Sequence, residues 1–399
     1  MVCPVLIFII DQYMKNNPCH LITFFKHYNL LILLLIGTVS CSHKNENPKN
    51  YDQLSFIFDT VQIDSKDEIL FLKGNLRLSD LSPDKKHLIN FNNYDHTLEV
   101  INLDELVLER KIPFEKEGPN GTGPRFSQIQ YLSHDSLYIN NEDRHNFFNF
   151  HGEIIGSFTT NSNGFTEALM MNEKIMLPVI FNSNPQQVFG LARDYKSQTL
   201  AFMKIDFNEK SIRKYDLPAF DDFKNFHYTV NEPRILVAPT AFTAIGNNKV
   251  LFSLEHTNDS YLYDFLQDSL IHIVNQQQLT ASRKEKAPPQ ELADIKEFHQ
   301  VNNMLKEQVS FTKPIWDGDK QVFYRFSHVE YDIEETQDLN PKSKSHVYLS
   351  ILDADFKLLA EHHIKAMQKP PIRSFVKDGK IWMYENIDDE LGFVRISFK

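Results

Sequence analysis

The chain has 399 residues, of which 42% are hydrophobic and 12% aromatic, and its formal net charge is -11. A chain of this length can bury a substantial core, and its 32 Phe and 15 Tyr favour strands, because bulky side chains pack well on a pleated surface. The acidic balance argues against nucleic-acid binding, which requires basic patches, so we expect no nucleic-acid partner.

Residues 1–40 are predicted to be an export signal. Residues 28–40 form an uncharged apolar run of about 13 residues behind Lys15 and Lys26, which is signal-peptide length and too short to span a bilayer. A further apolar run before Met14 is not required by a signal peptide. We therefore expect translation to begin at Met14.

Cys41 is the predicted site of lipid attachment. Gly37, Thr38 and Ser40 lead directly into it, a pattern that resembles the lipobox of bacterial lipoproteins. A polar, Asn-rich tether follows over residues 41–51. The predicted location is the cell envelope, periplasmic or surface-exposed, with the lipid anchoring the protein to a bacterial membrane; the other interpretation is an ordinary signal peptide with an incidental cysteine.

Residues 52–399 carry a degenerate repeat and no cysteine. A short apolar pattern, which we interpret as an inner strand, mostly follows polar turns such as SPDKK, SHDS and GNNK, and a hairpin pattern follows most copies. The six copies begin at Leu88, Leu137, Ile175, Val250, Val322 and Ile381. This repetition predicts an all-β fold, a six-bladed β-propeller. The sixth copy lacks its last strand, so we expect a strand in residues 54–63 to complete it and close the ring.

One amphipathic helix is predicted in an insertion at about residues 275–308. Apolar residues follow Pro288 and Pro289 at helical spacing, namely Leu292, Ile295, Phe298, Met304 and Leu305. The helix either packs on the propeller or docks a partner protein.

A family resemblance supports the same fold. Residues 117–126, EGPNGTGPRF, with the strand and hairpin pattern behind them, resemble one blade of an NHL-type six-bladed propeller. Signal, tether and propeller together are similar to the uncharacterised six-bladed propeller lipoproteins of Bacteroidetes-type bacteria, a family carried as a domain of unknown function. The resemblance implies a fold and a location, and it supplies no catalytic residue.

The turns that follow the repeated pattern are predicted to emerge on one face and to form a ligand rim around a central funnel. The rim residues are Arg144, His145, His256, Arg325 and His328. The arginines would bind a carboxylate or sulfate, and the histidines would act as acid, base or metal ligand. The other interpretation is a set of solvated loop tips.

The sequence contains no HExxH, GxSxG, P-loop, dinucleotide or EF-hand motif, so it predicts no cofactor, no metal site and no assigned catalytic residue. We interpret the protein as a non-catalytic binding or protein-interaction module. Its partners would be the membrane, through the lipid anchor, and an unknown ligand or envelope protein. The alternative is a lyase or hydrolase acting on a carbohydrate or peptide in the central funnel.

Overall fold

The computed structural model describes residues 51 and 53–399, except 125, 127, 142–143, 161–171, 182–183 and 335–341. The predicted signal peptide and Cys41 lie outside the described residues. Tyr51–Lys399 is one unit, built mainly from antiparallel strands. None of the helices in these described ranges is long and apolar enough to cross a membrane.

Three four-stranded sheets come first along the chain. The first sheet contains β2 (Ser79–Leu81), β3 (His87–Asn92), β4 (Thr97–Asn102) and β5 (Val107–Pro113). The second contains β6 (Gln128–Ser133), β7 (Ser136–Asn141), β8 (Arg144–Phe148) and β9 (Ile154–Thr159). The third contains β10 (Glu173–Phe181), β11 (Asn184–Asp194), β12 (Leu200–Asp206) and β13 (Ser211–Asp216).

Three further sheets follow. The fourth contains β16 (Ala241–Gly246), β17 (Lys249–Leu254), β18 (Ser260–Asp264) and β19 (Ser269–Ile273). The fifth contains β21 (Ser310–Phe311), β22 (Ile315–Asp317), β23 (Val322–Tyr331), β24 (Lys344–Leu352) and β25 (Leu358–His363). The sixth contains β26 (Ser374–Lys377), β27 (Lys380–Ile387), β28 (Glu390–Phe398) and, beside β28, the N-terminal strand β1 (Phe56–Gln62).

The recurring polar turns join the first strand of a sheet to the second. SPDKK, SHDS and GNNK connect β2 to β3, β6 to β7 and β16 to β17. Left-handed backbone occurs in these connections at Lys85, Asn247 and Asn248. Asn adopts that conformation at lower cost than most residues because its short polar side chain bonds locally, which explains the composition of the turns.

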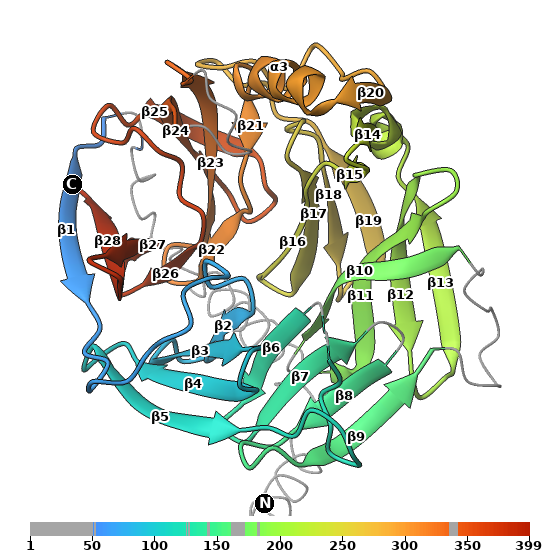
Figure 1. Cartoon of the computed structure of the whole chain (residues 1–399), viewed down its shortest axis with the longest axis vertical. Coiled ribbons are helices and arrows are strands. Elements are labelled where there is room, and N and C mark those ends of the chain that lie inside the picture. Colours follow the sequence, from blue (N-terminus) through green and yellow to red (C-terminus); the bar gives the residue numbers. More distant parts are fainter. Residues whose placement is uncertain are drawn as a thin grey trace, which may run out of the picture. The chain divides into compact units, whose positions relative to one another are not determined.

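The repeated apolar pattern marks the second position of five sheets, counting β21 and β22 of the fifth sheet as one first position because both pair with β23. Only in the third sheet, at Ile175 in β10, does it mark the first strand. Its interpretation as the inner strand is therefore wrong for five copies. The innermost strands are the first ones, and contacts link β2 to β6, β6 to β10, β10 to β16, β16 to β22 and β22 to β26. Figure 1 shows the six sheets around a common centre with these strands nearest to it.

Six apolar clusters fill the spaces between neighbouring sheets. Leu98 and Phe148 belong to the cluster between the first and second sheets, and Phe202 and Phe252 to the cluster between the third and fourth. The first and sixth sheets share a cluster that contains Trp382. Both faces of most sheets are thus covered, which accounts for strands that are apolar on consecutive residues.

A small satellite unit lies beside the fourth and fifth sheets (Figure 1). It contains β14 (Tyr228–Glu232), β15 (Ile235–Val237), β20 (Glu291–Asp294) and helix α3 (Ile295–Lys306), preceded by the 3-10 helix η1 (Pro218–Phe226). Phe298, Met304 and Leu305 of α3 pack on this sheet, as expected of an amphipathic helix. Leu292, expected on the helix, instead lies in β20 and pairs with Val230 of β14.

Candidate ligand site

Arg144 and His145 differ in their surroundings although they are adjacent in β8. Arg144 is exposed, whereas His145 is fully buried and its Nδ1 lies 2.7 Å from the hydroxyl of Tyr138, with which it shares a hydrogen bond. Adjacent residues of a strand point to opposite faces, so the two side chains cannot serve one rim.

Arg325 lies within β23 and not in a turn, and it is 1% exposed. Its guanidinium donates hydrogen bonds to the carbonyls of Thr312 (3.1 Å) and Leu254 (2.8 Å) and to Oδ1 of Asn258 (2.9 Å). It also lies over the ring of Phe311. Burial lowers the pKa of Arg325 to about 9. These bonds join β23 to the β17–β18 connection, so Arg325 has a structural role.

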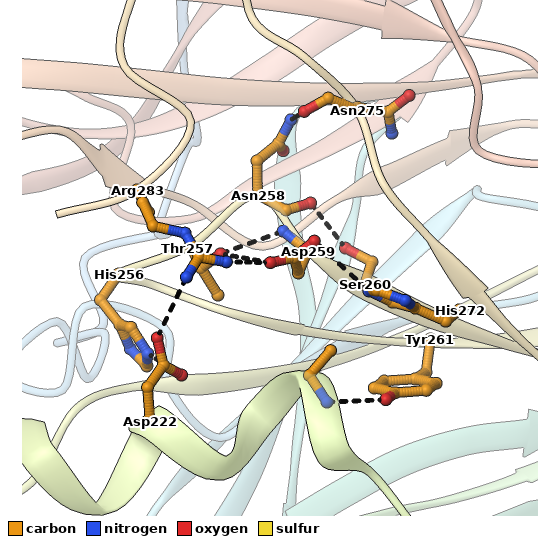
Figure 2. A network of polar contacts seen from close by, with 11 residues as sticks. Asp222, His256, Thr257, Asn258, Asp259, Ser260, Tyr261, His272, Asn275 and Arg283 are labelled. Atoms are coloured by element: carbon orange, nitrogen blue, oxygen red, sulfur yellow. Dashed lines mark hydrogen bonds and ion pairs between the residues drawn. The ribbon is translucent and has the colours of Figure 1, made fainter. Parts of the chain in front are cut away.

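His256 belongs to a polar network around the β17–β18 connection, which Figure 2 shows. Its Nε2 lies 3.1 Å from Oδ1 of Asp222 in η1, and Arg283 pairs with both Asp222 and Asp259. Burial acts to raise the pKa of Asp222, but the hydrogen bond and charge of His256 and the charge of Arg283 hold it below its usual value. The network attaches η1, through Asp222, and the loop after β19, through Arg283, to the β17–β18 connection of the fourth sheet.

His256 and His328 are brought together, in a cavity of about 230 Å³ beside α3. Glu255, Lys284 and Glu330 also line it. Burial lowers the pKa of His328 to about 4 and that of Lys284 to about 8. The Lys284 ammonium donates to the carbonyl of Leu305 and to Oγ of Ser310, both at 2.7 Å. Of the five predicted rim residues, His256 and His328 line this cavity, whereas Arg144, His145 and Arg325 do not, so the five do not converge on it.

The central cavity has a volume of about 600 Å³ and is lined by the first strands of all six sheets. Three ionisable side chains from different sheets reach it: Asp80 of β2, Lys313 between β21 and β22, and Arg373 next to β26. Each is partly buried, and each lines the cavity. Lys85 and Asn248 of the first-to-second-strand turns also line this cavity, so it opens on the face opposite to the predicted rim.

Side chains connect some of the first strands across this cavity. Oδ2 of Asp80 accepts a hydrogen bond from the backbone N–H of Tyr131 (2.9 Å). The amide of Gln130 bonds to both backbone groups of Ile180, and Arg373 donates to the carbonyl of Ser79. These bonds join the sixth, first, second and third sheets.

Lys313 has a different environment. It lies at the break between β21 and β22, which both pair with β23. Pro314 follows it and lacks the N–H that would continue the ladder. In the part of the chain that the structure describes, the Lys313 ammonium has no hydrogen bond and no carboxylate within 4.0 Å. Burial and the charge of Arg373 lower its pKa to about 8, against the effect of Asp80.

A second cavity, of about 950 Å³, lies further along the same strands. Earlier residues of β10 and β16 line it, namely Lys174 to Leu177 and Ala241, whereas later residues of both strands line the central cavity. Asn93 of the β3–β4 turn also lines it, which places it on the face of the predicted rim, although none of the five rim residues does.

Comparison with known proteins places the chain in a family. The model of the family described as Domain of unknown function (DUF4221) matches residues 52–363. The chain belongs to this family. This match confirms the expected resemblance to a family of unknown function.

Two solved structures from Bacteroides have a similar fold. A crystal structure of a DUF4221 member from Bacteroides vulgatus has a TM-score of 0.59 and 14% identity, covering 87% of this chain and 98% of that chain. A protein from Bacteroides fragilis, named as a candidate exported protein, has a TM-score of 0.50 and 9% identity, covering 86% and 95%. The C-terminal WD40 domain of Sif2 matches with a TM-score of 0.37 and 10% identity, covering 80% and 68%. The comparison with curated proteins found no match.

The residues that line the central cavity of this DUF4221 protein were absent from the predicted site. Lys313 in TKPIW and Arg373 in PIRSF are basic residues directly before a short apolar strand, and this repetition is the signal that could have indicated them. Across the described ranges, no three His, Cys, Asp or Glu side chains are grouped so that they could hold a metal ion.

Proposed function

We propose that this protein is a binding module of the bacterial cell envelope that holds a ligand in the central cavity. The convergence of Asp80, Lys313 and Arg373, from three sheets, on a cavity of about 600 Å³ carries the proposal. Burying charged groups without full pairing costs several kcal/mol, so a centre that served packing alone would favour apolar side chains. The volume is typical of small-molecule sites.

The proposal includes a six-bladed propeller closed by the N-terminal strand. Six sheets with six shared apolar clusters support the blade number. The pairing of β1 with β28, from Phe56 with Phe398 to Gln62 with Gly392, supports closure. Closure in this manner would leave no free edge on the last sheet.

Export and lipid attachment at Cys41 are also part of the proposal. The apolar run and small residues before Cys41 support both, and a structurally similar protein named as a candidate exported protein is consistent with export. Metabolic labelling of cells with a radioactive fatty acid is expected to mark the wild-type protein but not Cys41→Ala. Labelling that persists in Cys41→Ala would contradict lipid attachment at this residue.

The hydrogen bonds of the predicted rim residues favour binding over catalysis. The donors of Arg325 are bonded to structural acceptors, and His256 is held by Asp222. An acid, a base and a charge stabiliser that converge on one point would be required for catalysis. The rim side chains do not have that arrangement.

Retention of small molecules tests the proposed function. The purified full-length protein is mixed with the small-molecule fraction of a bacterial extract, desalted and denatured, and the released compounds are identified by mass spectrometry. Ser374→Trp places an indole on the cavity wall, and Ser211→Trp makes the same change on the outer strand β13. We expect the wild type and Ser211→Trp to retain a compound that Ser374→Trp does not. Equal retention by all three, or none by the wild type, would refute the proposal.

A further inference from the structure

The described wall of the central cavity is more basic than acidic. Lys85, Lys313 and Arg373 line it, and Asp80 is the one carboxylate among the lining residues that the structure describes. The net charge of the chain has the opposite sign, at -11. A ligand that neutralised the excess positive charge would relieve the repulsion between Lys313 and Arg373, a repulsion that contributes to lowering the pKa of Lys313.

The charged side chains of this wall differ in how many hydrogen bonds they form with other described residues. Asp80 accepts from the Tyr131 N–H and, within the described residues, forms no ion pair with Lys313 or Arg373 at 4.0 Å or less. Among the described residues, Arg373 donates one N–H, to the carbonyl of Ser79, which leaves most of the five donors of its guanidinium without a partner in that part of the chain. The Lys313 ammonium, with no partner in the described part of the chain, has three.

We propose that Lys313 and Arg373 bind an oxyanion in the central cavity, the carboxylate or phosphate group of a small molecule. This inference rests on the proposed function and names the chemistry of its ligand. A guanidinium matches two oxygens of such a group in one plane, and an ammonium adds a point charge with freely oriented donors. The negative charge of Asp80 disfavours an oxyanion bound close to it. The Asp80 carboxylate can, however, accept a hydrogen bond from another part of the ligand.

The charge of Lys313 persists at the pH where binding would occur. Burial and Arg373 lower the pKa of its ammonium to about 8, so the group is mainly protonated at pH 7. Burial raises the pKa of the Asp80 carboxyl, against the effect of the Tyr131 N–H and of the charges of Arg373 and Lys313.

Thermal unfolding of the full-length protein tests the inference directly. Sodium chloride at pH 7 is replaced by phosphate, succinate or citrate at constant ionic strength, and the change in Tm is measured. A ligand that binds only the folded state raises Tm as its concentration exceeds its Kd. Lys313→Met removes the proposed contact, and Lys286→Met removes the same charge from an exposed position outside the cavity.

We expect at least one oxyanion to raise the Tm of the wild type and of Lys286→Met, and its apparent Kd to rise at least tenfold in Lys313→Met. Asp80→Asn should lower that Kd, because it removes the opposing charge. Phosphate acting alone would assign a phosphate site, and succinate or citrate acting alone a carboxylate site. An equal response of Lys313→Met and Lys286→Met to all three anions, including no response, would overturn the inference.

Failure of this inference and failure of the proposed function have different signatures. A neutral compound retained by the wild type and lost in Ser374→Trp would leave the binding function in place and exclude the oxyanion. Conversely, an oxyanion effect that depends on Lys313, without any compound retained from the extract, would leave the site in place and remove the support for a ligand-carrying function.

Discussion

Acidification should destabilise this domain through His328. The side chain lines the small cavity beside α3, where Glu255 and Glu330 favour its protonated form and Lys284 and Lys306 oppose it. Burial outweighs these charges and lowers the pKa of His328 from 6.5 to about 4. Its Nδ1 is buried without a hydrogen-bond partner among the described residues. A proton on this ring would therefore be poorly compensated.

The sign and size of the effect follow from linkage. As pH falls below about 6.5, the unfolded chain binds a proton on this histidine, whereas the folded protein does so only near pH 4. The contribution of His328 to stability is therefore complete above pH 6.5 and is lost between pH 6.5 and 4. Each pKa unit corresponds to about 1.4 kcal/mol, so the loss reaches at most about 3.5 kcal/mol for this one group.

Urea denaturation at pH 7.5 and at pH 4.5 measures this loss. His328→Gln has a side chain of similar size that does not titrate, and His151→Gln makes the same change at an exposed turn. The wild type and His151→Gln should lose about 2 to 3 kcal/mol more unfolding free energy on acidification than His328→Gln does. Equal losses in all three proteins would refute the claim that burial holds His328 neutral.

Substitutions at three positions test structural roles by urea denaturation at pH 7. Arg325→Lys should cost about 2 kcal/mol more than Arg325→Met, because lysine retains a buried charge but cannot reach all three acceptors; the reverse order would contradict this. Asp59→Asn removes ion pairs with Lys380 and Arg395 between β1 and its sheet and should cost about 1 kcal/mol, most of which disappears in 1 M salt. Asp294→Ala should cost about 1 kcal/mol by removing the α3 N-cap, and an unchanged midpoint would rule that out.

The sequence predicts the all-β class well because its turns contain polar residues that are typical of strand connections. Asn247, Asn248 and Lys85 occur where the backbone is left-handed, and the apolar second strands stand out behind such turns. The first strands are harder to recognise. β2 and β22 have three residues each, which is too short for an alternating pattern, and their place in the fold depends on contacts with neighbouring sheets.

The error at the predicted rim has a comparable cause. β23 extends ten residues, to Tyr331, so Arg325 and His328 lie within this strand and not, as predicted, in a turn that follows it. A polar residue in a β-rich chain resembles a turn residue until its partners are known. The start of α3 was also misplaced, because Leu292 was expected on the helix and lies in β20. The local signal for the start is Asp294, whose carboxylate accepts from the N–H of Glu297 at 2.9 Å, while Glu297 accepts from the N–H of Ala293 at 2.7 Å, which is close to a capping box.

The local repetition around Lys313 and Arg373 marks two basic residues, but it could not show that they meet Asp80, because the three side chains come from different sheets and reach one cavity only when the first strands face a common centre. Each alone resembles a surface charge beside a short strand. Together they are an energetic liability, since no ion pair joins Asp80 to either cation within 4.0 Å in the described chain. These charges lower the stability of the folded state at the cavity that all six sheets line. Ligand binding explains them better than a contribution to stability does. The six apolar clusters between neighbouring sheets contain none of the three.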